Sequence, residues 1–217
     1  MQGPLRECAP ERLILIETLR WVPGAGPVRG AAHLARMARS GAALGVAFDA
    51  KAARARLDAV TGAGPQRLRL TLEADGALHL ETMPIGRAPA HWHVALASTP
   101  LDAADPWRRH KTSARAIYEH ARTRMPDGVD EIIFLNQHGR VAEGTISNVF
   151  LERDGVLLTP PAGEGALPGI LRGALLASGR AREAALSAAD LRLGRLFVGN
   201  SLRGLIGAEL TVARTPF

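Results

Sequence analysis

Two Asp-Gly pairs, each set between segments in which apolar and polar residues alternate, place the strongest constraint on how this chain can fold. Residues 67–84 alternate on both sides of Asp75-Gly76, and residues 146–161 alternate around Asp154-Gly155. Asp-Gly is typical of the tight turn of a β-hairpin, because that turn needs a left-handed backbone. The sequence therefore predicts one hairpin in each half of the chain.

Further segments with helical or strand periodicity surround the two hairpins. Helices are expected over residues 31–45, 51–60, about 112–125 and 167–179, with Asp49 as the N-cap of the second. Strands are expected over residues 12–20, 91–98, 131–136 and 195–200. Residues 99–110 contain two prolines and little periodicity, and we interpret them as a linker. The mixture predicts an α+β protein with an N-terminal lobe over residues 1–98 and a C-terminal lobe over residues 111–217.

The charge of the chain bears on its partners. The net charge is +6, from 27 basic and 21 acidic residues. A basic chain invites a nucleic-acid-binding interpretation. The basic residues are spread along the whole sequence, however, and no motif of the known nucleic-acid-binding modules occurs. We therefore expect no nucleic-acid partner.

Hydropathy and cysteine usage give further expectations. No apolar run reaches the ~18 to 20 residues of a membrane span, and the first residues lack the order of a signal peptide. We expect no membrane partner and a cytoplasmic location. The single cysteine, Cys8, excludes an internal disulfide and a multi-cysteine metal site, and no metal is expected.

Amine chemistry in this chain can use only two side chains, because Lys51 and Lys111 are the only lysines. Lys51 begins an amphipathic helical segment next to several arginines and is interpreted as solvated. Lys111 follows a segment rich in arginine, and nearby cations and partial burial both favour the neutral amine that covalent catalysis needs. An ordinary surface lysine at the start of a helix is the alternative.

Other residues are each open to two interpretations. Glu143 is either a turn residue or a buried carboxylate aimed at a heterocycle nitrogen, whose close approach Gly144 would allow. Gly169 begins a helix whose backbone N–H groups can bind an anion, or it belongs to a plain helix start. Ser201 can donate a hydroxyl to the same anion. Arg36 is either the cationic partner of that anion or one more surface arginine.

Taken in order, these segments resemble the class IV aminotransferases, which are the fold type IV pyridoxal phosphate enzymes. The resemblance spans about residues 12–210 and is strongest from Lys111 to Gly204. It is carried by the lone lysine and by the blocks ETLR, HLARMARSGAALG, DEIIFLN, GRVAEGTISNVF, LLTPP, LPGILR and FVGNSLRG. It implies a two-lobed α+β fold, pyridoxal 5'-phosphate as the cofactor, a small-molecule amino substrate and a homodimer.

The resemblance also implies roles for single residues. Lys111 would be the catalytic residue, which binds the cofactor covalently and moves protons, and Glu143 would accept the proton on the pyridine nitrogen. Leu167 would pack against the cofactor ring. The cofactor phosphate would be bound by Arg36, Ile170, Leu171 and Ser201. A dicarboxylate substrate needs cations, for which the candidates are Arg203, Arg20 and Arg108.

The family contains both lyases and aminotransferases, and this sequence favours a lyase. Asn200-Ser201-Leu202 resembles the lyase branch, and Ala116 stands where branched-chain enzymes have a tyrosine, because Tyr118 is out of register. We expect a 4-amino-4-deoxychorismate lyase that forms 4-aminobenzoate and pyruvate for folate biosynthesis. The alternatives are an aminotransferase that moves an amino group from an amino acid or amine to a 2-oxo acid, a cofactor-binding protein without catalysis, and a nucleic-acid-binding module.

Overall fold

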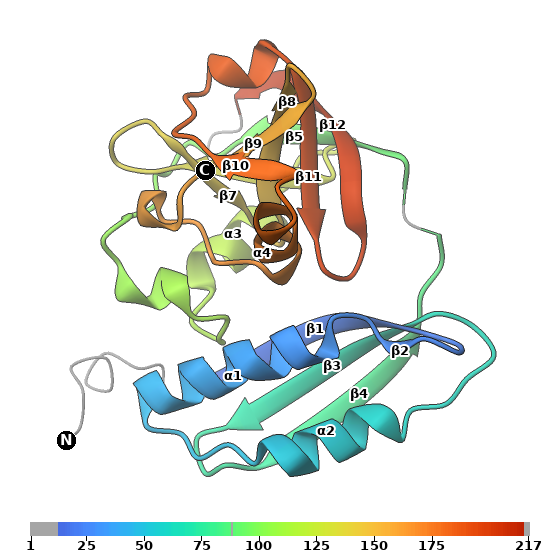
Figure 1. Cartoon of the computed structure of the whole chain (residues 1–217). Coiled ribbons are helices and arrows are strands. Elements are labelled where there is room, and N and C mark those ends of the chain that lie inside the picture. The colour runs from blue at the N-terminus through green and yellow to red at the C-terminus, as the bar shows by residue number, and fades with distance from the viewer. Residues whose placement is uncertain (1–12, 88, 215–217) are drawn as a thin grey trace. The chain divides into compact units, whose positions relative to one another are not determined.

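The computed structural model describes residues 13–87 and 89–214, and Cys8 lies outside them. The chain forms two compact units. Unit 1 contains the chain up to Arg87 together with His110–Ala114, and unit 2 contains the remainder. Both units combine helices and sheets, so the predicted α+β class is confirmed (Figure 1).

Unit 1 is a four-stranded sheet with two helices. Its strands are β1 (Ile14–Val22), β2 (Gly26–Pro27), β3 (Gln66–Glu73) and β4 (Leu78–Pro84), in the order β2-β1-β3-β4. The helices are α1 (Gly30–Leu44) and α2 (Ala50–Asp58), which lie on one face of the sheet in Figure 1. That face carries the fully buried leucines, because side chains alternate along each strand. They are Leu15, Leu19, Leu68, Leu70 and Leu72.

Local signals in unit 1 are confirmed. The backbone N–H of Ala52 donates to the Asp49 side chain at 2.9 Å, so Asp49 caps α2 as predicted. Strands β3 and β4 pair antiparallel on either side of Asp75-Gly76. Gly76 has φ of 89°, a left-handed conformation that side chains other than glycine rarely adopt.

Unit 2 is an eight-stranded sheet in the order β10-β9-β8-β11-β12-β5-β6-β7. Its strands are β5 (His91–Leu96), β6 (Glu131–Leu135), β7 (Val141–Gly144), β8 (Asn148–Arg153), β9 (Val156–Thr159), β10 (Ala181–Glu183), β11 (Arg195–Asn200) and β12 (Gly204–Arg214). The helices are α3 (Ala116–Thr123) and α4 (Ile170–Ala177), with short 3-10 turns at Pro106–Arg109, Ala162–Glu164 and Asp190–Arg192. The second predicted hairpin, β8–β9 around Asp154-Gly155, is present.

The sheet of unit 2 curls. Residues 145–147 join edge strand β7 directly to β8, which lies in the interior of the strand order, and the N–H of Gly144 donates to the carbonyl of Ser147 at 2.7 Å. A flat sheet cannot bring an edge strand back to an interior one over three residues. The core inside this curl is built mainly from aliphatic strand residues such as Val94, Ile133, Val149 and Val198.

The compact units divide the chain differently from the predicted lobes. Strand β5, predicted within residues 1–98, belongs to the sheet of unit 2, where it pairs parallel with β12 and β6. The helix predicted from about residue 112 begins only at Ala116. The expectation for residues 112–115 is wrong because Thr112 and Ser113 pair with β1 in unit 1, through an isolated bridge from Thr112 to Leu15.

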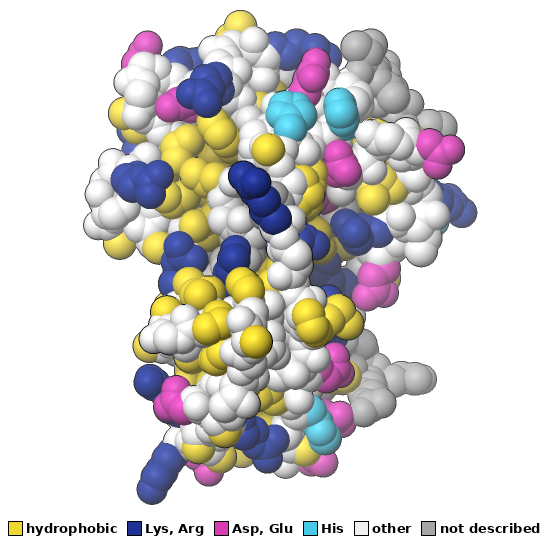
Figure 2. Space-filling view, turned by 90° about the vertical axis from the view of Figure 1, so that its right-hand side faces the viewer, with side chains coloured by type: hydrophobic (Ala, Val, Ile, Leu, Met, Phe, Trp, Pro, Cys, Tyr) yellow, Lys and Arg dark blue, Asp and Glu magenta, His cyan; other side chains and the backbone are white. Residues whose placement is uncertain are grey.

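The described residues contain neither a membrane-spanning helix nor a cluster of metal ligands. Helices in the part of the chain that the structure describes are all too short or too polar to cross a membrane. Among residues 13–87 and 89–214, no three His, Cys, Asp or Glu side chains gather as a metal site would require. Figure 2 shows Lys and Arg side chains distributed over the face drawn, with Asp and Glu side chains among them.

Candidate functional site

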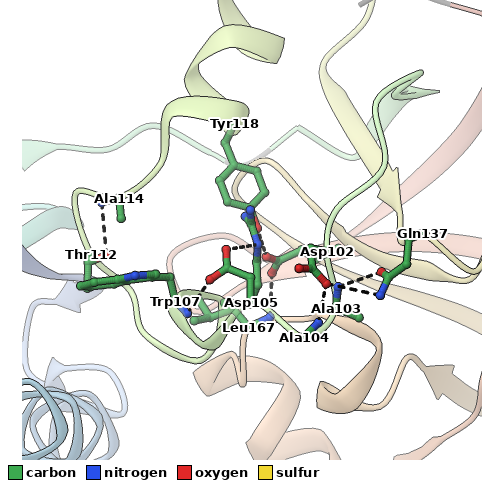
Figure 3. A network of polar contacts seen from close by, with 12 residues as sticks. Asp102, Ala103, Ala104, Asp105, Trp107, Thr112, Ala114, Tyr118, Gln137 and Leu167 are labelled. Atoms are coloured by element: carbon green, nitrogen blue, oxygen red, sulfur yellow. Dashed lines mark hydrogen bonds and ion pairs between the residues drawn. The ribbon is translucent and has the colours of Figure 1, made fainter. Parts of the chain in front are cut away.

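Glu143 is a buried carboxylate at the end of β7, with only 6% of its surface exposed. The Tyr118 hydroxyl donates a hydrogen bond to Oε1, and the backbone N–H of Leu167 donates to Oε2 at 2.9 Å. Figure 3 shows Tyr118 reaching from α3 towards the region of Leu167. The carboxylate is therefore fixed in orientation by a different donor on each oxygen, and Glu143 is not a turn residue.

A second buried carboxylate, Glu131, holds the segment that follows Glu143. Glu131 is fully buried and begins β6. Its Oε1 accepts bonds from the N–H and hydroxyl of Thr145 and from the N–H of Ile132, and its Oε2 accepts bonds from the N–H of Ile146 and the hydroxyl of Ser147. These five bonds shape the 145–147 connection and so place the strand end that carries Glu143.

The packing of Glu131 also explains Gly144. A Cβ at position 144 would lie 2.8 Å from a Glu131 carboxylate oxygen and 2.5 Å from the Ser147 hydroxyl. Sequence reasoning attributed this glycine to the close approach of a heterocycle. The structure gives a different reason, since the group that approaches Gly144 is the Glu131 carboxylate.

The start of α4 lies beside the same region. Gly169 has an extended backbone and precedes α4, and no side chain caps this helix end. Asn148 donates from Nδ2 to the carbonyl of Leu167 at 2.9 Å, and a Cβ at Gly169 would overlap Asn148 Oδ1. The first N–H groups of a helix have no intrahelical acceptor, so the backbone of Ile170 and Leu171 suits an anion. The Leu171 side chain itself is buried in the core.

The turn after β11 completes this region of unit 2. Asn200 donates from Nδ2 to the carbonyl of Ile146 at 3.1 Å, and its Oδ1 accepts bonds from the N–H groups of Leu202 and Arg203. A Cβ at the preceding Gly199 would lie 3.0 Å from Leu171 Cδ2. Unit 2 therefore gathers five predicted cofactor residues in one neighbourhood. They are Glu143, Leu167, Ile170, Leu171 and Ser201.

The other predicted cofactor residues, Lys111 and Arg36, lie in unit 1. The carbonyl of Lys111 accepts the N–H of Ile16 at 2.8 Å, which pins the lysine to β1. Arg36 donates to both oxygens of Glu17, from Nε at 2.8 Å and from Nη2 at 2.6 Å. His33 Nδ1 lies 2.6 Å from the same carboxylate. All three side chains of this Glu17–His33–Arg36 cluster are buried, so Arg36 is not a surface arginine.

The Glu17–His33–Arg36 cluster shifts the ionisation of its members. Burial opposes the charged form of Glu17, but the hydrogen bonds from His33 and Arg36 and the Arg36 charge outweigh it and lower the Glu17 pKa. Burial, the largest cause, and the positive charges of Arg36 and Lys111 lower the pKa of His33, and together they outweigh the Glu17 carboxylate, which raises it. His33 is therefore neutral at neutral pH and donates from Nδ1 to the Glu17 carboxylate.

Stability should depend on pH through Glu17. Its folded pKa lies below its ordinary value of 4.5, so its contribution is present above that value and is lost as pH falls further. We expect Glu17→Gln to lower the free energy of unfolding by about 3–5 kcal/mol at pH 7, because Arg36 keeps a buried charge without its carboxylate. The difference in free energy of unfolding between wild type and Glu17→Gln should narrow below pH 4.5. Thermal unfolding from pH 7 to 3.5 measures this difference, with the exposed Glu81→Gln on β4 as the control. A difference that stays constant over this pH range would contradict a lowered Glu17 pKa.

The three predicted substrate arginines occupy different settings. Arg108 lies 3.3 Å from Asp105 and stacks on the Tyr118 ring at 5.1 Å, and Arg203 lies over Trp92 at 5.8 Å. Arg20 on β1 is paired in register with Arg67 on β3. The buried Nε atoms of Arg20, Arg67, Arg108 and Arg203 have no hydrogen-bond partner among the described residues. Guanidinium groups with such donors suit an anionic group.

The residues of unit 2 fit pyridoxal 5'-phosphate. A phosphate needs N–H donors, which the uncapped start of α4 offers. A protonated pyridine nitrogen needs an oriented carboxylate, which Glu143 offers. Sequence reasoning missed Glu131 and Tyr118. A glutamate at the head of the apolar run EIIFLN was a signal for Glu131, since such a residue is seldom buried without partners.

The chain matches one protein family in sequence and several solved structures in fold. The sequence pattern of the family Amino-transferase class IV matches residues 14–209. The structure of a candidate amino-acid aminotransferase from Mesorhizobium loti is 45% identical and superposes with a TM-score of 0.87, over 92% of this chain and 100% of that chain. Branched-chain amino acid aminotransferase from Escherichia coli superposes with a TM-score of 0.73 at 20% identity, over 91% and 76% of the two chains.

Two further proteins are similar to this chain in sequence, one over most of its length and one over a short part. Aminodeoxychorismate lyase of Saccharomyces cerevisiae is 28% identical in an alignment 189 residues long that covers 75% of this chain and 49% of the yeast protein. Branched-chain-amino-acid aminotransferase of Escherichia coli (strain K12) is 47% identical over only 49 residues, 23% of this chain and 16% of that protein. The chain thus spans about half the length of the yeast lyase.

Proposed function

Because this chain belongs to the class IV aminotransferase family and has the predicted fold type IV architecture, we propose that it is a pyridoxal phosphate-dependent 4-amino-4-deoxychorismate lyase. The family uses pyridoxal 5'-phosphate. The observation that carries the proposal is the extent of similarity, which covers 75% of this chain for the yeast lyase and 23% for the Escherichia coli branched-chain enzyme. Ala116, in place of the tyrosine of branched-chain enzymes, supports the same choice.

The proposed cofactor contacts come from residues with suitable chemistry. Lys111 binds the cofactor covalently through its amine, and the Glu143 carboxylate accepts the hydrogen bond of the pyridine nitrogen. Leu167 packs against the ring. The phosphate is bound by the N–H groups of Ile170 and Leu171, the Ser201 hydroxyl and the Arg36 charge. When bound, pyridoxal phosphate withdraws electrons from the carbon that carries the substrate nitrogen.

The proposed reaction leaves one proton transfer to the protein. Lys111, whose amine is free once the substrate nitrogen has taken its place, takes the proton from the substrate carbon that carries the nitrogen. The substrate ring then becomes aromatic as its C–O bond to the enolpyruvyl group breaks, and the departing enolate takes a proton from water and leaves as pyruvate. The two carboxylates of the substrate are bound by cations among Arg203, Arg20 and Arg108. Arg20 is supported by its register partner Arg67, which adds a second cation at that position of the sheet.

An aminotransferase is the second candidate, because the 45% identical protein from Mesorhizobium loti carries that name. Its substrates would be an amino acid or amine and a 2-oxo acid. The same side chains would serve the cofactor in either reaction. The two candidates differ in whether a carbon–oxygen bond of the substrate breaks, and this difference can be measured directly.

The deciding experiment supplies both kinds of substrate to purified protein loaded with pyridoxal phosphate. We expect 4-aminobenzoate and pyruvate in equal amounts from 4-amino-4-deoxychorismate, at a rate far above that of Lys111→Ala. If no product forms, and an amino donor instead bleaches the bound chromophore until a 2-oxo acid restores it, the aminotransferase is correct. The predicted homodimer and cytoplasmic location remain predictions. Sedimentation equilibrium measures the assembly.

A further inference from the structure

We propose that Tyr118 is a positioning residue, which holds the Glu143 carboxylate in the orientation that receives the pyridine nitrogen of the cofactor. The inference rests on the proposed function, since it takes from it the role of Glu143. It adds a residue to which neither the comparisons nor the family motifs give a role.

The two oxygens of Glu143 have different kinds of donor. Oε2 accepts a backbone N–H, that of Leu167, which no side-chain substitution removes. Oε1 accepts the Tyr118 hydroxyl, which comes from a helix rather than from the strand. A carboxylate can rotate about its last bond, so a single donor leaves its plane undefined, whereas one donor on each oxygen fixes it. A carboxylate accepts about four hydrogen bonds, so the Tyr118 bond is compatible with one from a ring nitrogen.

Tyr118 is itself rigidly held. It is 6% exposed and packs edge-on against Phe134, with ring centroids 5.4 Å apart and planes at 83°. The guanidinium groups of Arg108 and Arg115 each lie 5.1 Å from the centre of its ring. Burial, and after it the negative charge of Glu143, raise the pKa of Tyr118 well above its ordinary value. The phenol therefore stays protonated and can only donate to Glu143.

Neighbouring residues of α3 bind the same stretch of chain. Arg115 donates to the carbonyl of Thr145 at 2.7 Å, and Arg122 donates to the Thr145 hydroxyl at 3.0 Å. Tyr118 and Arg122 are four residues apart in α3 and so share one face of the helix, and Arg115 is the residue that precedes the helix. This face of α3 contacts residues 143–145, and Tyr118 is its contact with the carboxylate.

The test is a double-mutant cycle of Tyr118→Phe and Glu143→Gln, read in the protein loaded with pyridoxal phosphate. Phenylalanine keeps the ring packing and removes only the hydroxyl. We expect Tyr118→Phe to weaken cofactor binding on the order of 10-fold, the effect of one hydrogen bond to a charged group. We also expect it to shift the absorbance maximum of the bound cofactor in the direction that Glu143→Gln shifts it. In the Glu143→Gln background, Tyr118→Phe should add little to either change.

A matched variant separates positioning from loss of packing. Phe134→Leu loosens the wall beside Tyr118 but keeps the hydroxyl, so it should lower the melting temperature of the cofactor-free protein without the absorbance shift. If Tyr118→Phe behaves like Phe134→Leu, or if its effects are the same in both backgrounds, Tyr118 is only structural and the inference is overturned.

The cycle also distinguishes this inference from the proposed function. If Glu143→Gln shifts the absorbance and Tyr118→Phe does not, the inference about Tyr118 fails while the role of Glu143 stands. If Glu143→Gln leaves binding and absorbance unchanged, or if wild-type protein does not bind the cofactor, the proposed function fails and takes the inference with it.

Discussion

Replacement of Lys111 by alanine is expected to reduce product formation by about 10³-fold or more, because the variant lacks both the covalent bond to the cofactor and the group that moves the proton. General acid–base catalysis alone contributes about 10²–10⁴-fold. The measurement is the rate of 4-aminobenzoate formation, together with mass spectrometry after borohydride reduction. Wild-type protein should carry one pyridoxyl group on Lys111, and the variant should carry none.

The structure predicts that the Lys111→Ala variant still folds. One of the contacts that hold this segment to β1 comes from the Lys111 backbone, whose carbonyl accepts the N–H of Ile16. Alanine keeps that bond, so the melting temperature of the cofactor-free variant should stay close to that of wild type. Lys51→Ala is the matched control, since Lys51 is exposed on α2 and is the only other lysine. A pyridoxyl group on Lys51, or full activity in Lys111→Ala, would refute the assignment.

The segment around Lys111 shows where local sequence patterns succeed and where they do not. The turns at Gly76 and Gly155 and the cap at Asp49 depend on residues next to one another in the chain, and all three were predicted. The conformation of residues 112–115 was not. Ser113 accepts the N–H of Ile14 at 3.0 Å, a contact between residues 99 positions apart. Such a pairing leaves no trace in the periodicity of either segment.

The candidate site repeats this contrast. Glu143, Gly169 and Ser201 were singled out from the sequence before any geometry was known, and their roles towards the cofactor stay predictions. Arg36 was predicted as a phosphate ligand, and nothing in the sequence pointed to its partner Glu17, 19 residues earlier. Tyr118 was set aside because it is out of register with a tyrosine of branched-chain enzymes. Its contact with Glu143 depends on how α3 lies against β7, which only the folded chain reveals.

Replacement of Glu131 is expected to have the largest effect on stability in unit 2. Glu131→Ala removes a carboxylate that accepts five hydrogen bonds, and it leaves buried N–H and hydroxyl donors at positions 132 and 145–147 without an acceptor. One unsatisfied buried donor costs about 1–3 kcal/mol. Relaxation and water entry recover part of the sum, so we expect a loss of about 4–5 kcal/mol in the free energy of unfolding. Urea unfolding followed by tryptophan fluorescence measures it.

Glu131→Gln separates the loss of acceptors from the loss of volume. Glutamine fills the same space, but its NH₂ group must face donors of the 145–147 connection whichever way the amide is turned. We expect Glu131→Gln to lower the free energy of unfolding by about 2–3 kcal/mol, because an acceptor is exchanged for a donor. The exposed Glu119→Gln in the same unit should change stability by less than about 0.5 kcal/mol. Since the 145–147 connection begins directly after Gly144, both Glu131 variants should also bind pyridoxal phosphate more weakly. Glu131→Gln with wild-type stability and cofactor affinity would mean that the connection keeps its shape without the carboxylate.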